Sequence, residues 1–196
     1  MSPENPASVI ERKEAPVVVV SVATPEDAQA IRDVQYRTWL ATYPENGSGI
    51  TVADINWYFN DFRKTFSEEM LKKLAHELGS LPDSDRAIVA KDEQGKIVGY
   101  AWLTKHDNQN ELGAIYIDPS FQGGGVGKRL WAEAEKFFDA AKETMLTVQE
   151  KNERAIGFYK KLGFEDTGKR LETLTFPSGA TFKEIKMVRP ADVPES

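Results

Sequence analysis

The sequence contains no cysteine and only two histidines, His76 and His106. Without cysteine no disulfide can form, so the reducing interior of a cell is a natural location and we expect a cytoplasmic protein. A zinc site would have to use carboxylates, because cysteine and histidine supply most zinc ligands. No spacing of these residues suggests such a site, and the sequence therefore predicts no bound metal.

Long hydrophobic runs and an excess of positive charge are also absent. The apolar run 17–20 is too short to cross a bilayer, and residues 1–16 lack the apolar stretch of a signal peptide. The formal net charge is −6, which is opposite in sign to what nucleic-acid binding favours. We therefore expect no membrane and no nucleic acid among the partners, and the acidic composition mildly favours cationic small molecules.

What is present is a series of apolar patterns over a length that suits one domain. Residues 1–16, rich in proline, glutamate and lysine, predict a disordered tail; residues 17–189 predict a single domain, and 190–196 a second tail. The predicted order is β-ααα-βββ-α-β-α-ββ. The predicted strands are 17–23, 87–90, 97–103, 112–117, 145–148, 164–176 and 181–188. The predicted helical segments are 24–39, 52–66, 67–78, 126–138 and 152–162. This order indicates an α/β protein with helices packed on a mixed sheet.

The most informative segment is the turn between the strand that ends at Ile117 and the helix that follows. Four glycines lie where this helix begins, namely Gly123, Gly124, Gly125 and Gly127. Each glycine inside a helix costs roughly 1 kcal/mol relative to alanine, and Lys128 and Arg129 follow in the first turn, where the helix dipole disfavours cations. Both features make sense if an anion binds there, because glycines let backbone N–H groups approach it. The alternative is a flexible loop between a strand and a helix.

Two common phosphate-binding patterns fail at this turn. The P-loop pattern would need a glycine at Gln122 and a hydroxyl side chain at Arg129. The dinucleotide pattern G-x-G-x-x-G, started from Gly123, would need a glycine at Lys128. A domain that binds a magnesium nucleotide is therefore the least favoured alternative.

The pattern that does fit is Q-x-x-G-x-G, formed by Gln122, Gly125 and Gly127. Here the sequence resembles the GNAT superfamily of N-acetyltransferases. The resemblance implies a mixed, mostly antiparallel central sheet flanked by helices, with acetyl-coenzyme A (acetyl-CoA) as the cofactor. It implies that the turn binds the pyrophosphate and that the preceding strand offers backbone hydrogen bonds to the pantetheine and acetyl groups. The implied cofactor residues are Ile115, Tyr116, Ile117, Gln122, Gly123, Gly124, Gly125, Val126, Gly127 and Lys128.

A second segment resembles the same family. The pattern N-x-x-A-x-x-x-Y-x-x-x-G-F is met by Asn152, Ala155, Tyr159, Gly163 and Phe164. Asn152 is a good helix N-cap, and Tyr159 lies about two helical turns further on, so both side chains face the same way. The resemblance implies that Asn152 contacts the cofactor and that the Tyr159 hydroxyl protonates or hydrogen-bonds the leaving thiolate. The alternative for Tyr159 is a core tyrosine with a satisfied hydroxyl.

The implied reaction is direct attack of a neutral amine on the acetyl carbonyl, and the absence of cysteine agrees with direct transfer. A base must remove a proton from the amine, and Glu111 is the best candidate because it lies eleven residues before Gln122, as in the histone-acetylating branch of the family. Strand alternation places Glu111 on the face of Ile115 and Ile117 unless a bulge intervenes. The alternative is a solvated acid at the end of a strand.

The acceptor is the least constrained part of the prediction. Trp39 and Tyr43 belong to an aromatic, acidic N-terminal region that could hold an alkylammonium group, although such aromatics more often form core. Thr147 stands where some amino-terminal peptide acetyltransferases of the family carry a glutamate, which argues against a protein amino terminus. We expect an N-acetyltransferase for a small amine, with a peptide or protein amine or a non-catalytic acyl-CoA-binding module as alternatives. The resemblance also makes a homodimer plausible.

Overall fold

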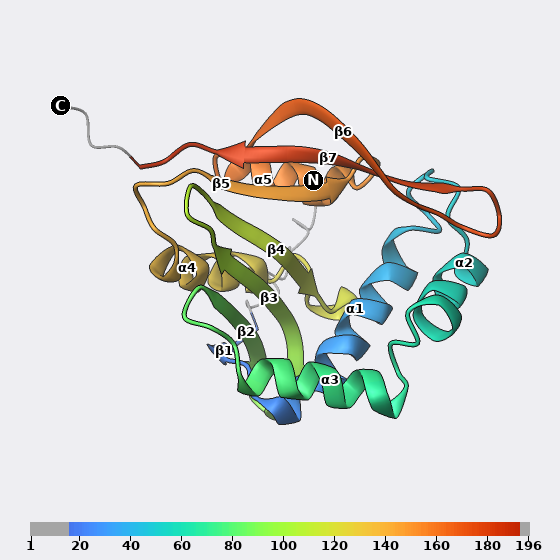
Figure 1. Ribbon diagram of the computed structural model, residues 1–196, viewed down its shortest axis with the longest axis horizontal. Helices are drawn as coiled ribbons and strands as arrows, with labels where there is room; N and C mark the ends of the chain where they lie inside the picture. Colours follow the sequence, from blue (N-terminus) through green and yellow to red (C-terminus); the bar gives the residue numbers. More distant parts are fainter. Residues whose placement is uncertain (1–15, 193–196) are drawn as a thin grey trace, which may run out of the picture.

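The computed structural model describes residues 16–192, so the predicted tails lie outside the described residues except for Pro16 and 190–192. The strands are β1 (Val18–Val22), β2 (Asp85–Asp92), β3 (Ile97–Lys105), β4 (Asn110–Ile117), β5 (Thr144–Gln149), β6 (Glu165–Thr175) and β7 (Thr181–Arg189). The α-helices are α1 (Ala28–Thr42), α2 (Val52–Asn56), α3 (Glu68–Gly79), α4 (Val126–Phe137) and α5 (Glu153–Lys161) (Figure 1). The predicted order of helices and strands is confirmed.

All seven strands join one sheet in the order β1-β2-β3-β4-β5-β7-β6. Neighbouring strands are antiparallel except β4 and β5, which run parallel and pair only at Asn110↔Thr144 and Glu111↔Met145. Beyond these two pairs β4 and β5 diverge, as Figure 1 shows. The sheet is therefore mostly antiparallel, as predicted, and it opens between its two parallel strands.

Helices cover both faces of the sheet. On one face, α1 and α3 bury Val34 and Leu74 against β2 and β3. On the other face, α4 and α5 bury Leu130 and Tyr159 against the central strands. A third, aromatic cluster lies where α1 and the segment after α2 meet the β6–β7 hairpin, and it contains Phe59. The opening between β4 and β5 is thus bordered by helices from both layers.

A β-bulge interrupts β4 at Gly113. The register between β3 and β4 shifts between Trp102 and Leu103, so Gly113 has no partner on β3. A bulge shifts the alternation of side chains between the two faces of a strand. Leu112 and Ile115 therefore both pack on the α4 face although they lie three positions apart.

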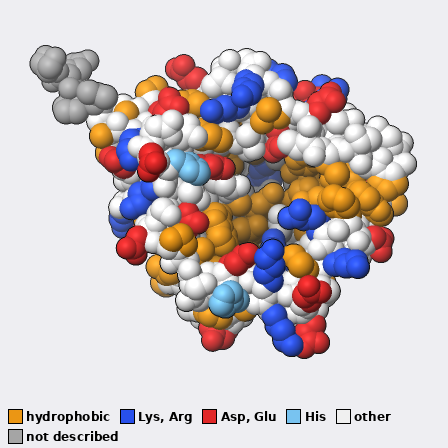
Figure 2. Space-filling model, in the orientation of Figure 1, with side chains coloured by type: hydrophobic (Ala, Val, Ile, Leu, Met, Phe, Trp, Pro, Cys, Tyr) orange, Lys and Arg blue, Asp and Glu red, His pale blue; other side chains and the backbone are white. Residues whose placement is uncertain are grey.

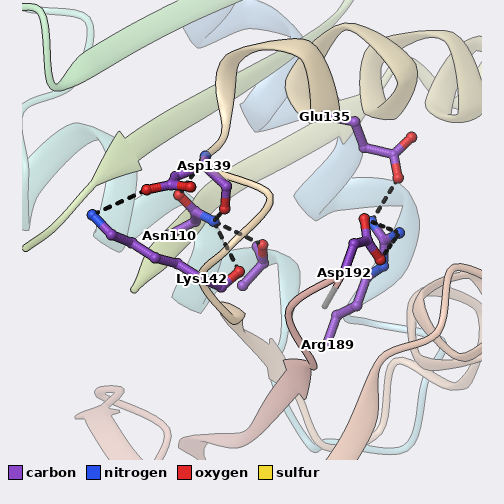
Figure 3. Close-up of polar contacts among 7 residues, drawn as sticks. Asn110, Glu135, Asp139, Lys142, Arg189 and Asp192 are labelled. Atoms are coloured by element: carbon purple, nitrogen blue, oxygen red, sulfur yellow. Dashed lines mark hydrogen bonds and ion pairs between the residues drawn. The ribbon is translucent and has the colours of Figure 1, made fainter. Parts of the chain in front are cut away.

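The closed end of the β4–β5 pair is fixed by a buried amide at the start of β4 (Figure 3). Asn110 Nδ2 donates to the carbonyl oxygens of Asp139 at 2.9 Å and Lys142 at 3.3 Å, and its Oδ1 accepts from the Asp139 N–H at 3.1 Å. The same view shows Arg189 of β7 paired with Glu135 of α4 at 2.6 Å. These contacts hold the α4–β5 connection in place, so the two strands separate from a fixed end.

The segment 52–66 differs from its prediction as one helix. α2 ends at Asn56 and continues as a π-helical turn, Trp57–Phe62, in which the Arg63 N–H donates to the Tyr58 carbonyl at 2.8 Å. A π turn has one more residue than an α turn, so consecutive aromatic rings can point to different neighbours. Phe59 is fully buried, whereas Tyr58 stacks on Trp39 with ring centroids 4.7 Å apart.

Candidate active site

A cleft of about 1240 Å³ occupies the opening between β4 and β5. Figure 2 shows this face of the molecule hollowed near its centre, with hydrophobic side chains around the hollow. One half of the cleft is lined by the glycine turn, the start of α4 and α5, and we call it the cofactor half. The other half is lined by the end of α1, the π-helical turn, β5 and the β6–β7 hairpin, and we call it the acceptor half.

The outer edge of β4 is available for hydrogen bonding inside this cleft. The Asp118 N–H donates to Val98 of β3 at 2.8 Å. Because N–H groups alternate in direction along a strand, those of Ile115 and Ile117 point away from β3 into the opening. The Ile117 carbonyl also points there and accepts from Thr38 Oγ1 at 3.1 Å and Gln122 Nε2 at 3.0 Å. Among residues 16–192, the strand predicted to bind the cofactor therefore presents backbone donors without a partner.

The glycine turn leaves the N-terminus of α4 uncapped. Gly125 is the N-cap residue, adopts a left-handed conformation with φ of 83°, and has no side chain to cap the helix. Among the described residues, the N–H groups of Val126, Gly127 and Lys128 have no hydrogen-bond acceptor. Uncapped N–H groups at a helix N-terminus, together with the helix dipole, make a site for an anion.

One predicted cofactor residue lies apart from this site. Gly124 is not among the residues that line the cleft, and a Cβ atom at this position would lie 2.5 Å from Cδ of Pro16. The glycine is therefore needed for close packing against the start of the described chain. The other predicted residues of the turn, from Gln122 to Lys128, line the cleft.

A basic side chain that the sequence reasoning missed completes the turn. Arg154 of α5 donates from Nη1 to Oε1 of Gln122 at 2.6 Å, and both residues line the cleft. The guanidinium lies beside the turn, since a Cβ atom on Gly123 would be 3.8 Å from Arg154 Nη2. Arg154 stands inside the second sequence pattern, but only the packing of α5 against α4 brings it to the glycines.

Asn152, the N-cap of α5, and Tyr159 within it line the same cleft. Asn152 caps the helix, because its Oδ1 accepts from the Ala155 N–H at 3.1 Å. Tyr159 is only 7% exposed, and within residues 16–192 its hydroxyl forms no hydrogen bond; the oxygen is not among the fully buried polar atoms that lack a partner, and the residue lines the cleft. Burial, and to a smaller extent the nearby Tyr116, raises the pKa of Tyr159. Its hydroxyl therefore remains a proton donor near neutral pH.

Glu111 is not brought into this cleft. Its carboxylate pairs with Nε2 of His106 at 2.7 Å at the start of β4, and it is not among the residues that line the cleft. The prediction that Glu111 shares a face with Ile115 and Ile117 is wrong, because the bulge at Gly113 shifts the alternation between them. The contacts of Glu111 agree with the alternative of an acid at a strand end.

Trp39 and Tyr43 line the acceptor half but also belong to the core. Trp39 is 5% exposed, and both faces of its ring are covered, by Tyr58 at 4.7 Å and by Phe182 at 5.2 Å. Its Nε1 donates to the Tyr116 hydroxyl at 3.2 Å. Because its faces are occupied, Trp39 cannot offer a free ring face to a cation, and it shapes the wall of the cleft.

The acceptor half contains a carboxylate that the sequence reasoning did not single out. Glu184 of β7 lines the cleft and accepts a hydrogen bond from Thr147 Oγ1 of β5 at 3.0 Å. No local pattern marks Glu184; only the pairing of β5 with β7 shows that it faces the opening.

Within the described part of the chain, no cluster of three or more His, Asp or Glu side chains could hold a metal. No helix of that part is long and apolar enough to cross a membrane.

A sheet that opens between two parallel strands, with a glycine turn before the helix that follows, agrees with the resemblance of the sequence to the GNAT superfamily. A model of the acetyltransferase (GNAT) family matches residues 54–164, more than half of the chain. The chain belongs to the acetyltransferase (GNAT) family.

Relatives and solved structures agree with this assignment. The chain is 40% identical over 81 residues to peptidyl-lysine N-acetyltransferase YjaB of Escherichia coli, a match that covers 41% of this chain and 50% of that protein. It is 33% identical over 94 residues to a mycothiol acetyltransferase of Saccharomonospora viridis, covering 42% and 31% respectively. The chain therefore spans half or less of the length of these two relatives.

The fold is shared with PaiA N-acetyltransferase from Thermoplasma acidophilum, whose crystal structure is a complex with coenzyme A. The TM-score is 0.65 at 22% identity, and the alignment covers 89% of this chain and 99% of that one.

Proposed function

We propose that this protein transfers the acetyl group of acetyl-CoA directly to a primary amine. One observation carries the proposal: the uncapped glycine turn, the open edge of β4 and the Tyr159 side chain all meet in one cleft. An anion site, a row of backbone donors and a protonated phenol are the parts that transfer from a phosphorylated thioester requires.

The cofactor half fits acetyl-CoA by its donors. The free N–H groups of Val126, Gly127 and Lys128 suit a pyrophosphate, and the Lys128 and Arg154 side chains add positive charge. The N–H groups of Ile115 and Ile117 suit the carbonyls of an extended pantetheine arm. When bound, acetyl-CoA supplies the acetyl group as a thioester. The fit of Gly124 is indirect, because this residue packs outside the cleft.

Two groups of this chain would act on the reacting atoms. The Tyr159 hydroxyl holds its proton because burial raises the pKa, and it donates that proton to the departing sulfur. A backbone N–H of the β4 edge stabilises the negative charge that develops on the acetyl oxygen. With no cysteine in the sequence, the chain has no thiol to carry the acetyl group, which supports direct transfer.

The acceptor is proposed to be an alkylamine on a small molecule. The apolar wall formed by Tyr58, Leu174 and Phe182 suits an alkyl chain, and the acceptor half also contains the Glu184 carboxylate. A lysine side chain presents the same chemical group, and the name of the Escherichia coli relative, a peptidyl-lysine acetyltransferase, favours it as the second candidate.

Thiol release tests the proposal. Purified protein is mixed with acetyl-CoA and a panel of primary alkylamines, diamines and lysine peptides, and free thiol is followed with a disulfide dye. We expect release that depends on an amine and a product heavier than that amine by one acetyl group. Tight binding of acetyl-CoA without thiol release for any amine would contradict the proposal and favour a module that only binds acyl-CoA.

A further inference from the structure

One carboxylate faces the acceptor half from β7, the strand between β5 and the edge strand β6. Glu184 is half-buried in β7, directly across from Gln149 of β5. Thr147 projects from the same face two residues along, and its hydroxyl donates to Oε1 of Glu184 at 3.0 Å. Two hydrogen-bonded strands therefore hold the carboxylate in position, and the threonine restrains its rotation.

Glu184 has no cation to neutralise it within the described part of the chain. Its sequence neighbour Lys183 pairs with Glu172 of β6 at 3.2 Å. Lys186 projects from the same face as Glu184 but forms no ion pair with it among the described residues. Because no described cation pairs with this carboxylate, a cation that enters the cleft could pair with it.

Tyr43 and Tyr116 line the same cleft as Glu184 and Tyr159. Burial raises the pKa of Tyr43 and of Tyr116, and the negative charge of Glu184 raises both further. The nearby Tyr116 in turn contributes to the raised pKa of Tyr159. Glu184 of β7 and Tyr159 of α5 thus line one cleft from a strand and from a helix.

Other charged residues that line the acceptor half are exposed to solvent, among them Lys151, which follows β5. Glu45, on the loop after α1, and Arg63, at the end of the π-helical turn, line the cleft but are exposed to solvent. Glu184 is half-buried, unlike Glu45, and it lines the same cleft as the apolar side chains of Tyr58 and Phe182. A carboxylate next to an apolar wall is complementary to a primary alkylammonium ion.

We propose, building on the proposed acetyl transfer, that Glu184 binds the ammonium group of the acceptor and removes its proton, with Thr147 as a positioning residue. The acceptor nitrogen loses two protons in the reaction. Glu184 takes the first and passes it to solvent, which frees the lone pair to form the new C–N bond. As the C–S bond breaks, Tyr159 protonates the sulfur and recovers a proton through solvent from the second N–H.

A binding experiment tests the first half of this proposal without turnover. The protein saturated with coenzyme A is titrated with n-butylamine hydrochloride at pH 7, followed by amide chemical shifts. We expect Glu184→Gln to weaken binding by about tenfold or more. The matched control is Glu172→Gln, which removes the same charge from the neighbouring strand outside the cleft and should bind as wild type does. Equal binding by wild type and Glu184→Gln would overturn the proposal.

The pH dependence of acetylation tests the second half. The Glu184→Gln variant lacks the base and can use only amine that is already unprotonated. Its kcat/KM for n-butylamine should therefore rise about tenfold per pH unit from pH 7 to 9, as the fraction of unprotonated amine rises. The wild-type value should stay nearly level, and exceed that of the variant about a hundredfold at pH 7. Thr147→Val should show a smaller loss, and Thr147→Ser should restore it. Parallel pH profiles for wild type and Glu184→Gln would refute proton removal by Glu184.

The two proposals fail in different ways. Acetylation of no amine by the wild type would end the transferase proposal, while the butylammonium titration would still decide whether Glu184 binds an ammonium ion. Acetylation that is equally fast in wild type and Glu184→Gln would keep the transferase and remove Glu184 from it.

Discussion

The guanidinium of Arg154 donates to Oε1 of Gln122 at 2.6 Å, and Nε2 of the same glutamine donates to the Ile117 carbonyl at 3.0 Å. Gln122 therefore links α5, across the glycine turn, to the end of β4. One amide side chain thus connects the glycine turn to α5 and to the end of β4. Loss of this link should affect the binding of acetyl-CoA more than the stability of the fold.

The variant Arg154→Gln tests this link and the added charge. Removing one charged hydrogen-bond donor beside a pyrophosphate should weaken acetyl-CoA binding about tenfold at low salt. The loss should shrink as salt screens the charge. Calorimetric titration at two ionic strengths measures both effects. The control Arg170→Gln removes an exposed arginine of β6 that pairs with Asp166, and it should bind acetyl-CoA as wild type does. Equal affinities for wild type and Arg154→Gln would show that this arginine is not part of the site.

Tyr159→Phe should lower kcat about a hundredfold or more, since general acids contribute about that much. Acetyl-CoA affinity and thermal stability should change little, because the hydroxyl has no protein partner among the described residues. Tyr36→Phe is the matched control. Its hydroxyl lies outside the cleft and donates to Asn56 Oδ1 at 2.5 Å, so this variant should lose stability and keep its kcat. An unchanged kcat in Tyr159→Phe would remove this tyrosine from the reaction.

Stability should fall on the alkaline side. Burial raises the pKa of Tyr43, Tyr100, Tyr116 and Tyr159, so these phenols stay protonated in the folded protein when the unfolded chain begins to ionise near pH ~10. The unfolded state then binds fewer protons, and each tyrosine lowers the free energy of unfolding by about 1.4 kcal/mol per pH unit. The contribution is fully present below pH ~10 and declines above it.

Urea denaturation at pH 9, 10 and 11 measures this decline. Tyr100→Phe removes one such tyrosine outside the cleft. In this variant the free energy of unfolding should fall less steeply with pH, by the contribution of one titrating group, about 1.4 kcal/mol per pH unit. Identical slopes for wild type and Tyr100→Phe would contradict the shift assigned to Tyr100.

Gly99→Ala should disturb β4 and hence the cleft. A Cβ atom at Gly99 of β3 would lie 3.0 Å from both the Tyr116 carbonyl oxygen and Cδ1 of Ile117. The backbone oxygen cannot move cheaply, so we expect a loss of about 1–3 kcal/mol of stability together with weaker acetyl-CoA binding. Gly157→Ala is the opposite case, because nothing lies within 4 Å of its added Cβ and it sits inside α5. The free energy of unfolding of Gly157→Ala should rise by up to about 1 kcal/mol. Chemical denaturation of both variants measures these changes.

Local patterns account for what the sequence predicted correctly. Asn152 caps its own helix, and the glycines of the turn adopt left-handed conformations at Gly123 and Gly125 that suit glycine. These features depend on neighbours within a few residues, so a short segment specifies them. The order of helices and strands follows from the same local periodicities.

The features that the sequence did not predict depend on contacts between distant segments. The bulge at Gly113 is a property of the β3–β4 pairing, and it moved Glu111 off the expected face. Glu184 becomes a cleft residue only because β7 pairs with β5, and Arg154 only because α5 packs beside α4. A single sequence without its pairing partners contains no pattern for these positions.

Calorimetric binding of acetyl-CoA to wild type, Gly125→Asp and Gly95→Asp tests the central claim most directly. Gly125 and Gly95 have φ values of 83° and 78° and nothing within 4 Å of an added Cβ, so both substitutions impose similar backbone strain. Only Gly125→Asp puts a negative charge at the proposed pyrophosphate site. We predict micromolar binding by wild type and Gly95→Asp and none by Gly125→Asp. Equal binding by all three proteins, or none by folded wild type, would contradict the assignment of this turn to acetyl-CoA.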